Sequence, residues 1–364
     1  MSTNMTVNQQ WRNRPSDQRF LTLQDLHNSV AKRRSVCAEE TVALDCLQVQ
    51  STDKGDVVLL NRESAGGASR LTHWAFGQLC TRAHAPAGFL RSLPAEIAVP
   101  ALQWKLETHE TEADEGNDAK LLIRRAGGDS QLRSVTSATY GRIYDAEVTA
   151  ALLKHVDQDI WKVPSASYSK EDPMRATTLY ASDHDIFIFL VDEGRPIEVC
   201  GEVLNRGFYV WNSEVGSATF GFASFTYDHV CDNRIIWNCG NFSELKIRHT
   251  AGGPHRFVAR AVPQLGAFAG SSDAKVVETV RAAKAIDVGK DRDEVLEWMR
   301  KRGFTTGMAK KSYDAAVADR RGYNPRTVWG LVQGATAAAR EVKYQDDRVA
   351  LEAQAGQLLN DLME

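Results

Sequence analysis

Apolar and polar residues alternate over residues 41–60, which is the pattern of half-buried strands. Residues 41–50 (TVALDCLQVQ) and 56–60 (DVVLL) flank turn-forming residues and predict one β-hairpin. Residues 120–125 (KLLIRR) and 131–139 predict a second hairpin around an Ala-Gly-Gly-Asp turn. β-Branched and aromatic residues are dense between positions 176 and 230, so further strands are expected there, interrupted by a turn or loop at Asp192–Pro196.

A helical spacing of apolar residues replaces this alternation in other segments. Leu21–Ala31 and Leu71–Arg82 are predicted helices, and Thr22 stands three residues before Asp25, which is the spacing of a helix-capping pair. A third helix is predicted from Asp145 to His155, with Asp145 as its N-cap. Its inward face is expected to carry Val148, Leu152 and Leu153.

The last hundred residues predict helices at 273–286, 291–302 and 325–362. Strands followed by helices indicate an α+β protein, with an antiparallel β-sheet core and a helical C-terminal third. We expect a flexible lead-in at 1–20, a mixed α+β core domain at 21–260, and a helical region at 261–364 packed on that core. Residues 107–118 are strongly acidic and predict an exposed loop.

Composition limits the class of protein. The chain has 364 residues, a net charge of −3 and no apolar run long enough to span a bilayer, and its polar start has no secretory leader pattern. A cytoplasmic location without membrane association is therefore expected. The six cysteines include no Cys-x-x-Cys pair, which favours reduced thiols. Positive charge is concentrated between residues 243 and 326. This segment has 17 Lys and Arg and 10 Asp and Glu, a net charge of +7.

Residue types that carry chemistry are present without a decisive motif. Cys231, Cys239, His249 and His255 have a C-x7-C-x9-H-x5-H spacing, which lacks the close cysteine pair of structural zinc sites, so no metal is expected. The sequence has no phosphate-binding P-loop and no glycine-rich dinucleotide motif, so no cofactor is expected either. Ser213 beside Glu214 lies in no nucleophile elbow and is interpreted as part of a turn. No catalytic residue is assigned.

The segment LKIRHTAGGPHR combines cations with a Gly252-Gly253 turn, a composition that favours contact with phosphate. Aromatic residues are dense on the predicted strands just before this segment. If they lie on an exposed face of the sheet, they would stack on nucleobases; the alternative is that they pack in the core. The predicted nucleic-acid-binding residues lie in or near these two segments and are Arg248, His249, His255, Arg256, Arg260, Trp211 and Trp237.

Three segments carry a resemblance to a known family. They are Asn212–Gly216 (NSEVG), Cys231–Asn233 and Arg248–Thr250, preceded by Ser134–Asp145 with Ser137, Tyr140 and Ile143. Together with the C-terminal helical sequence, they resemble the phage/plasmid-like proteins of domain-of-unknown-function family 932, over roughly residues 75–360. The chain departs from the family pattern at Asp232-Asn233-Arg234. The resemblance implies a mobile-element setting and supplies no catalytic residues.

These observations lead to three functional hypotheses. The first is a nucleic-acid-binding protein of a phage or plasmid, acting on single-stranded DNA as an annealing or recombination accessory factor and assembling into homo-oligomers. The second is an enzyme acting on nucleic acid or nucleotides, with Arg248, His249 and Glu214 in its site. The third is an adaptor that docks to a partner protein through the C-terminal helices.

Overall fold

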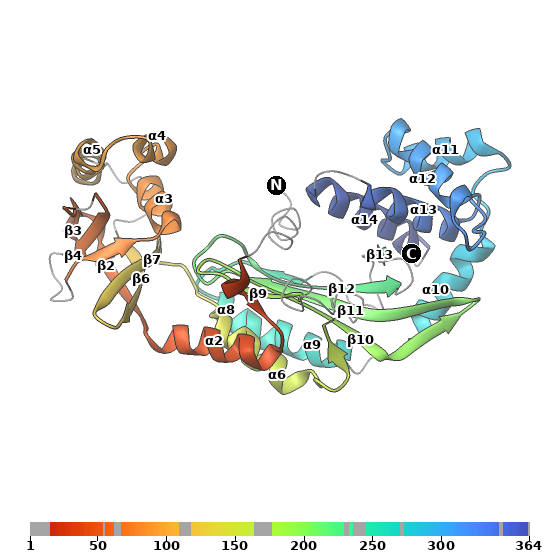
Figure 1. Ribbon diagram of the computed structural model, residues 1–364, viewed down its shortest axis with the longest axis horizontal. Coiled ribbons are helices and arrows are strands. Elements are labelled where there is room, and N and C mark those ends of the chain that lie inside the picture. The colour runs from red at the N-terminus through yellow and green to blue at the C-terminus, as the bar shows by residue number, and fades with distance from the viewer. Residues whose placement is uncertain are drawn as a thin grey trace.

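The computed structural model contains two β-sheets joined side by side, with helices on both (Figure 1). Helices are concentrated in the C-terminal third, so the α+β class is confirmed. The residues that the structure describes are 15–53, 55–61, 67–108, 118–163, 177–228, 233–235, 245–269, 273–341 and 345–362.

The smaller sheet, with its helices, forms the lobe on the left of Figure 1. Its strands are antiparallel except for the parallel pair β5–β7, and both predicted hairpins are confirmed as β3–β4 and β6–β7. Residues 41–43, expected in the first hairpin, instead end β2 and pair with β6. The strand order is β2 (Cys37–Ala43), β6 (Asp118–Ala126), β7 (Asp129–Ser137), β5 (Ser69–Leu71), β4 (Val57–Asn61) and β3 (Leu47–Ser51).

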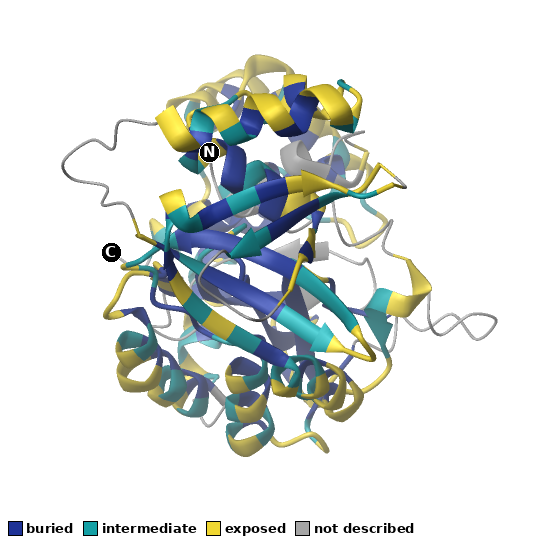
Figure 2. Ribbon diagram, turned by 90° about the vertical axis from the view of Figure 1, so that its left-hand side faces the viewer, coloured by how far each residue is buried: buried dark blue, intermediate teal, exposed yellow. Residues whose placement is uncertain are grey.

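Three helices pack on this sheet: α3 (His73–Arg82), α4 (Ala87–Arg91) and α5 (Ala95–Thr108). Helix α3 begins after the N-cap Thr72, whose hydroxyl accepts the N–H of Ala75. Figure 2 looks onto this lobe and shows buried strands beneath helices whose outer sides are exposed. The core between sheet and helices is aliphatic and includes Leu79, Leu102 and Leu121.

The larger sheet is built around one long hairpin, β10 (Ile186–Val199) and β11 (Glu202–Asn212). The turn or loop predicted at Asp192–Pro196 does not end the strand: β10 continues through it, its pairing with β11 is irregular between Asp192 and Ile197, and Asp192 accepts the N–H of Arg195. The chain reverses instead at Cys200 and Gly201, which both have positive φ. The other strands are β1 (Arg19–Phe20), β8 (Trp161–Lys162), β9 (Leu179–Ala181), β12 (Phe220–Asp228), β13 (Asn233–Ile235) and β14 (Leu245–Ile247).

Two glycines let aromatic rings lie flat on one face of this sheet. Gly207 and Phe225 are cross-strand partners, and so are Gly221 and Trp211. A Cβ on Gly207 would lie 2.0 Å from the Phe225 ring, and one on Gly221 would lie 1.8 Å from the Trp211 ring. The rings occupy the space that a larger partner would fill, so this face is packed rather than open.

Below the larger sheet lie α2, α6 and the continuous helical run α8, η5 and α9 (Figure 1). Thr22 caps α2 as predicted, accepting the N–H of Asp25. The N-cap of α6 is Tyr144 and not Asp145, whose side chain is buried in the junction described below. The bounds are α2 (Leu23–Ser35), α6 (Asp145–His155), α8 (Gly253–Arg256), η5 (Phe257–Ala261, a π-helix) and α9 (Val262–Ala269).

The remaining helices form the lobe on the right of Figure 1. Glu202 of β11 connects this lobe to the larger sheet. It accepts hydrogen bonds from Trp329 Nε1 (3.1 Å) and the Tyr323 hydroxyl (2.9 Å) and pairs with Lys284 (2.6 Å). Two helices, α13 and α14, occupy the span 325–362 where a single helix was expected. A further helix, α12 (Thr306–Ala318), was not predicted. The helices are α10 (Ala274–Ala285), α11 (Arg292–Lys301), α12 (Thr306–Ala318), α13 (Val328–Arg340) and α14 (Gln345–Asn360).

The span expected as one core domain, 21–260, thus holds two separate sheets. No helix in the described part of the chain is long and apolar enough to cross a membrane.

Candidate nucleic-acid interface and the junction behind it

Three sequence segments that the resemblance singled out meet where the two sheets join. The Asn212 side-chain amide donates to the Ile143 carbonyl (2.9 Å) and to Asp145 Oδ1 (2.7 Å). The Ile143 N–H in turn donates to His249 Nδ1 (3.3 Å), and the Tyr140 hydroxyl donates to the Ser213 carbonyl (3.2 Å). Residues 134–145, 212–216 and 248–250 therefore form one structural unit, called the junction here.

The centre of the junction is a buried ion cluster. The Glu214 carboxylate accepts from Arg133, both side chains being almost fully buried, and Arg33 lies 3.4 Å from the same oxygen. Arg33 also pairs with Asp145 at 2.7 Å. Arg142 donates to the Glu214 backbone carbonyl. Arg33 belongs to α2, Arg133 to β7 of the smaller sheet and Arg142 to the loop before α6, while Glu214 follows β11 of the larger sheet. One glutamate therefore ties the smaller sheet, α2 and the larger sheet together.

The two acids of the cluster have opposite pKa shifts. Burial, together with the neighbouring Glu214 carboxylate, raises the pKa of Asp145 to about 8. Burial also opposes ionisation of Glu214, but the charges of Arg133 and Arg33 outweigh it and hold the pKa of Glu214 below its usual range. Glu214 is therefore the fixed anion of the junction.

Helix α3 closes the junction from the side of the smaller sheet. The Val215 carbonyl accepts from both Trp74 Nε1 (3.1 Å) and Gln78 Nε2 (2.7 Å), and Gln78 Oε1 accepts the Val135 N–H (2.9 Å). Gly216 follows with a φ of 91°, a conformation that favours glycine. The NSEVG segment, interpreted from sequence as a simple turn, is thus the contact between the lobes.

His249, predicted to contact nucleic acid, is only 9% exposed. Its ring stacks on Tyr140, with centroids 5.1 Å apart. Nδ1 accepts a hydrogen bond from the Ile143 N–H. A proton on Nδ1 would break this bond and place two donors against each other. Burial, chiefly, lowers the pKa of His249 to about 4. The residue is neutral at pH 7 and packs inside the junction.

The His249 imidazole predicts a specific dependence of stability on pH. An unfolded histidine has a pKa of about 6.5, so the unfolded chain binds a proton there before the folded protein does, and stability is lost as pH falls from about 6.5 towards 4. Between pH 7 and 4.5 the wild type should lose about 2 kcal/mol more than His249→Asn, whose amide oxygen keeps an acceptor for the Ile143 N–H. Urea unfolding of both proteins across this range measures the difference, and parallel curves would mean that His249 has the same pKa in the folded and unfolded states.

The other predicted cations lie on the surface next to the junction. Arg248, His255 and Arg260 are exposed and Arg256 is half-buried. Arg256 and Arg260 are four residues apart in the run α8–η5, which places them on one side, and the exposed His255 is next to Arg256. Arg256 donates to the Thr250 hydroxyl (2.5 Å) and the Arg248 carbonyl (3.3 Å), which holds the preceding loop against this helix. Residues 246–260 are called the basic segment.

The basic segment is unusual in its charge balance. From Leu245 to Ser272 the chain has four Lys and Arg and no Asp or Glu. Within the described residues, no carboxylate forms an ion pair with Arg248, Arg256 or Arg260. Exposed arginines elsewhere are commonly paired, as in Arg70–Asp129 (2.8 Å) and Arg292–Asp314 (2.9 Å).

The remaining predicted site residues do not join this surface. Trp211 is 1% exposed and packs in the aromatic face of the larger sheet, so it offers no exposed ring. Trp237, Cys231 and Cys239 lie outside the described residues. Among the described residues, no group of His, Cys, Asp or Glu has the geometry of a metal site.

The residues of the enzyme hypothesis are divided between surface and interior. Arg248 is exposed, whereas His249 and Glu214 are buried in the junction. The sequence missed Arg33, Arg133 and Arg142. Their partners Asp145 and Glu214 stand 72 to 181 positions away along the chain and are not marked by any local motif.

The comparisons with known proteins give no match. No protein-family model matches the chain, and neither a curated protein nor a solved structure is similar to it.

Proposed function

We propose that this protein binds single-stranded nucleic acid through the basic segment. The observation that carries the proposal is a set of clustered arginines, Arg248, Arg256 and Arg260, which have no carboxylate partner in the described chain. A phosphate backbone supplies a regular row of anions for such a surface, and the release of its counterions drives binding. The exposed His255, next to Arg256 in α8, adds a further donor.

The burial of the aromatic residues limits how the protein could distinguish one nucleotide sequence from another. Trp211 and His249 are buried, so neither ring can stack a base, and the described part of this surface presents mainly cations. Contacts of this kind position a nucleic-acid backbone and carry little base specificity. The proposal is therefore binding with weak sequence preference, which suits a protein that covers or pairs single strands.

The biological setting that we propose is a phage or plasmid, with a role as a single-strand annealing or recombination accessory factor. The resemblance to domain-of-unknown-function family 932 supports this setting. Residues 134–145, 212–216 and 248–250, which carry part of the resemblance, meet at the junction, and Thr250 and Pro254 of the basic segment lie against Gly141 of that junction. Homo-oligomers would place several basic segments along one strand and multiply a modest affinity.

Binding should depend on the exposed arginines. At about 0.1 M salt, Arg248→Ala/Arg260→Ala is expected to weaken binding to a fluorescent oligothymidylate by about 20-fold, because two phosphate contacts are lost. Fluorescence anisotropy measures the dissociation constant. The matched control is Lys310→Ala/Lys311→Ala, which removes two exposed cations of α12 far along the chain. Equal losses in both variants, or no loss in the first, would refute the assignment of the surface.

A further inference from the structure

The smaller lobe has a cavity that the proposed function does not use. It has a volume of about 370 Å³ and lies between the first residues of α3, the end of α4, the start of α5 and strand β4. Its floor is apolar and includes Phe76, Leu90 and Ala98, all of which are buried. This volume is at the lower end of the range for small-molecule sites, about 300–1,000 Å³, and fits one small ligand.

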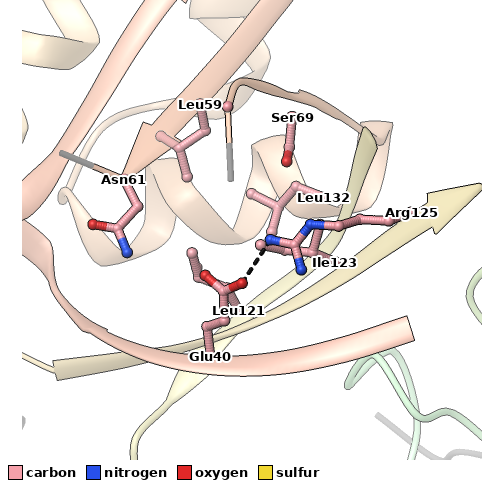
Figure 3. Close-up of a pocket in the computed structure, with 9 residues that line it drawn as sticks. Glu40, Leu59, Asn61, Ser69, Leu121, Ile123, Arg125 and Leu132 are labelled. Atoms are coloured by element: carbon pink, nitrogen blue, oxygen red, sulfur yellow. Dashed lines mark hydrogen bonds and ion pairs between the residues drawn. The ribbon is translucent and has the colours of Figure 1, made fainter. Parts of the chain in front are cut away.

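A second cavity in the same lobe provides a contrast (Figure 3). It is bounded by the ion pair Glu40–Arg125 (2.6 Å) and by Leu121, and its volume of about 10 Å³ barely admits one water molecule. Such a gap is a packing irregularity. The larger cavity is of a different kind, because it combines volume with an apolar floor and polar walls.

The charges around the larger cavity are unequal on its two sides. Arg91, on the helical side, donates to the His73 carbonyl (2.7 Å), and its guanidinium lies 5.3 Å from the centroid of the Phe76 ring. No carboxylate in the described chain pairs with Arg91. On the strand side, Arg70 is held by Asp129 through two bonds of 2.8 Å, and Asp56 adds a further acid. An anion is therefore favoured on the side of Arg91.

The strand side also carries hydrogen-bonding groups suited to a flat polar ring. Gln131 has an amide that both donates and accepts, and Asp56 has a carboxylate that accepts from an amino group. A ligand that matches all of these features has an anionic end, a flat body that packs on Phe76, and an edge with donors and acceptors.

We propose that this cavity binds one nucleoside monophosphate unit, with its phosphate at Arg91 and its base on the floor formed by Phe76, Leu90 and Ala98. The unit is either a free nucleotide or one nucleotide of a strand. The site lies in a different lobe from the basic segment, so the two sites can be tested separately.

The test uses the full-length protein and isothermal titration with AMP, alongside a fluorescent oligodeoxyadenylate. Ala95, which lines the cavity, is replaced by phenylalanine to fill it, and Ala101→Phe on the exposed side of the same helix is the matched control. Ala95→Phe is expected to weaken AMP binding at least tenfold, and Ala101→Phe to leave it unchanged. Arg91→Ala should weaken AMP tenfold but leave adenosine unaffected, because adenosine lacks the phosphate.

The outcomes separate the sources of the ligand. AMP binding that Ala95→Phe abolishes identifies a free nucleotide. If AMP does not bind and only the oligonucleotide is weakened by Ala95→Phe, the unit belongs to a strand. If neither ligand responds to Ala95→Phe and Arg91→Ala while both variants keep the wild-type melting temperature, the proposal is overturned. Arg248→Ala/Arg260→Ala should leave AMP binding intact, so failure of the basic segment and failure of this cavity are distinguishable.

Discussion

Replacing Glu214 with alanine is expected to lower the free energy of unfolding by about 3–5 kcal/mol, because the change leaves buried arginines without their anion. Arg133 is almost fully buried, and Arg33 retains only Asp145 as a carboxylate partner. The raised pKa of Asp145 means that this remaining acid ionises less readily at neutral pH, although loss of the Glu214 charge would ease that shift. Urea unfolding followed by circular dichroism measures the effect.

The matched control is Glu40→Ala. Glu40 pairs with Arg125 at 2.6 Å, but both side chains are partly exposed, at 25% and 38%. Water screens such a pair, so the expected loss is about 1 kcal/mol or less. If Glu214→Ala costs no more than Glu40→Ala, the junction is not held together by its ion cluster.

The second large effect is expected at Gly141, where the junction meets the basic segment. A Cβ on this residue would lie 1.9 Å from the Thr250 carbonyl oxygen and 2.9 Å from Pro254 Cδ. The Gly141 N–H also donates to the His249 carbonyl (3.1 Å), so the two backbones cannot separate without losing this bond. Gly141→Ala should destabilise the protein by about 3 kcal/mol. It should also weaken binding of single-stranded DNA, since residues 250–254 lie within the basic segment.

Gly88→Ala is the control for this substitution. Gly88 lies in α4, and no atom lies within 4 Å of the position that its Cβ would take. Alanine there should be neutral or stabilise the protein by about 0.5–1 kcal/mol, because it restricts the unfolded chain and favours the helix. Thermal melts of the two variants compare the same chemical change in a crowded and in an open site. Equal melting temperatures would show that the segments do not pack closely at Gly141.

Local signals in the sequence were sufficient for several elements. Thr22 and Asp291 cap α2 and α11 through their side chains, and the predicted starts of these helices, at residues 21 and 291, lie within two residues of those observed. The β6–β7 hairpin followed from two strand-forming runs around the turn at Gly127 and Gly128, which have positive φ in the structure. In each case the determining contacts are between residues close in sequence.

Predictions failed where distant residues override a local pattern. Residues 192–196 contain Gly and Pro and look like a turn, but Asp192 is fully buried and pairs with Arg206 (3.6 Å) of the neighbouring strand, which keeps the chain in the sheet. Asp145 has the identity of an N-cap, yet it serves the ion cluster. Asp192 also pairs locally with Arg195 (2.7 Å), but both outcomes include a partner on another element.

The candidate site was predicted in part for the same reason. A run of cations is visible in any sequence, and Arg248, His255 and Arg260 are exposed as a binding surface requires. Burial depends on the tertiary fold, so sequence did not distinguish His249 and Trp211 from their exposed neighbours. The cavity beside Arg91 draws on several separate elements and has no sequence motif.

The salt dependence of single-stranded DNA binding tests the central claim most directly. Each phosphate contact contributes about −0.7 to the slope of log K against log salt concentration. Removing Arg248 and Arg260 should therefore make the slope less negative by about 1.4 per bound protomer, whereas Lys310→Ala/Lys311→Ala should leave it unchanged. Equal slopes for the wild type and Arg248→Ala/Arg260→Ala, or no binding by the wild type at low salt, would contradict the assignment of the basic segment as the nucleic-acid interface.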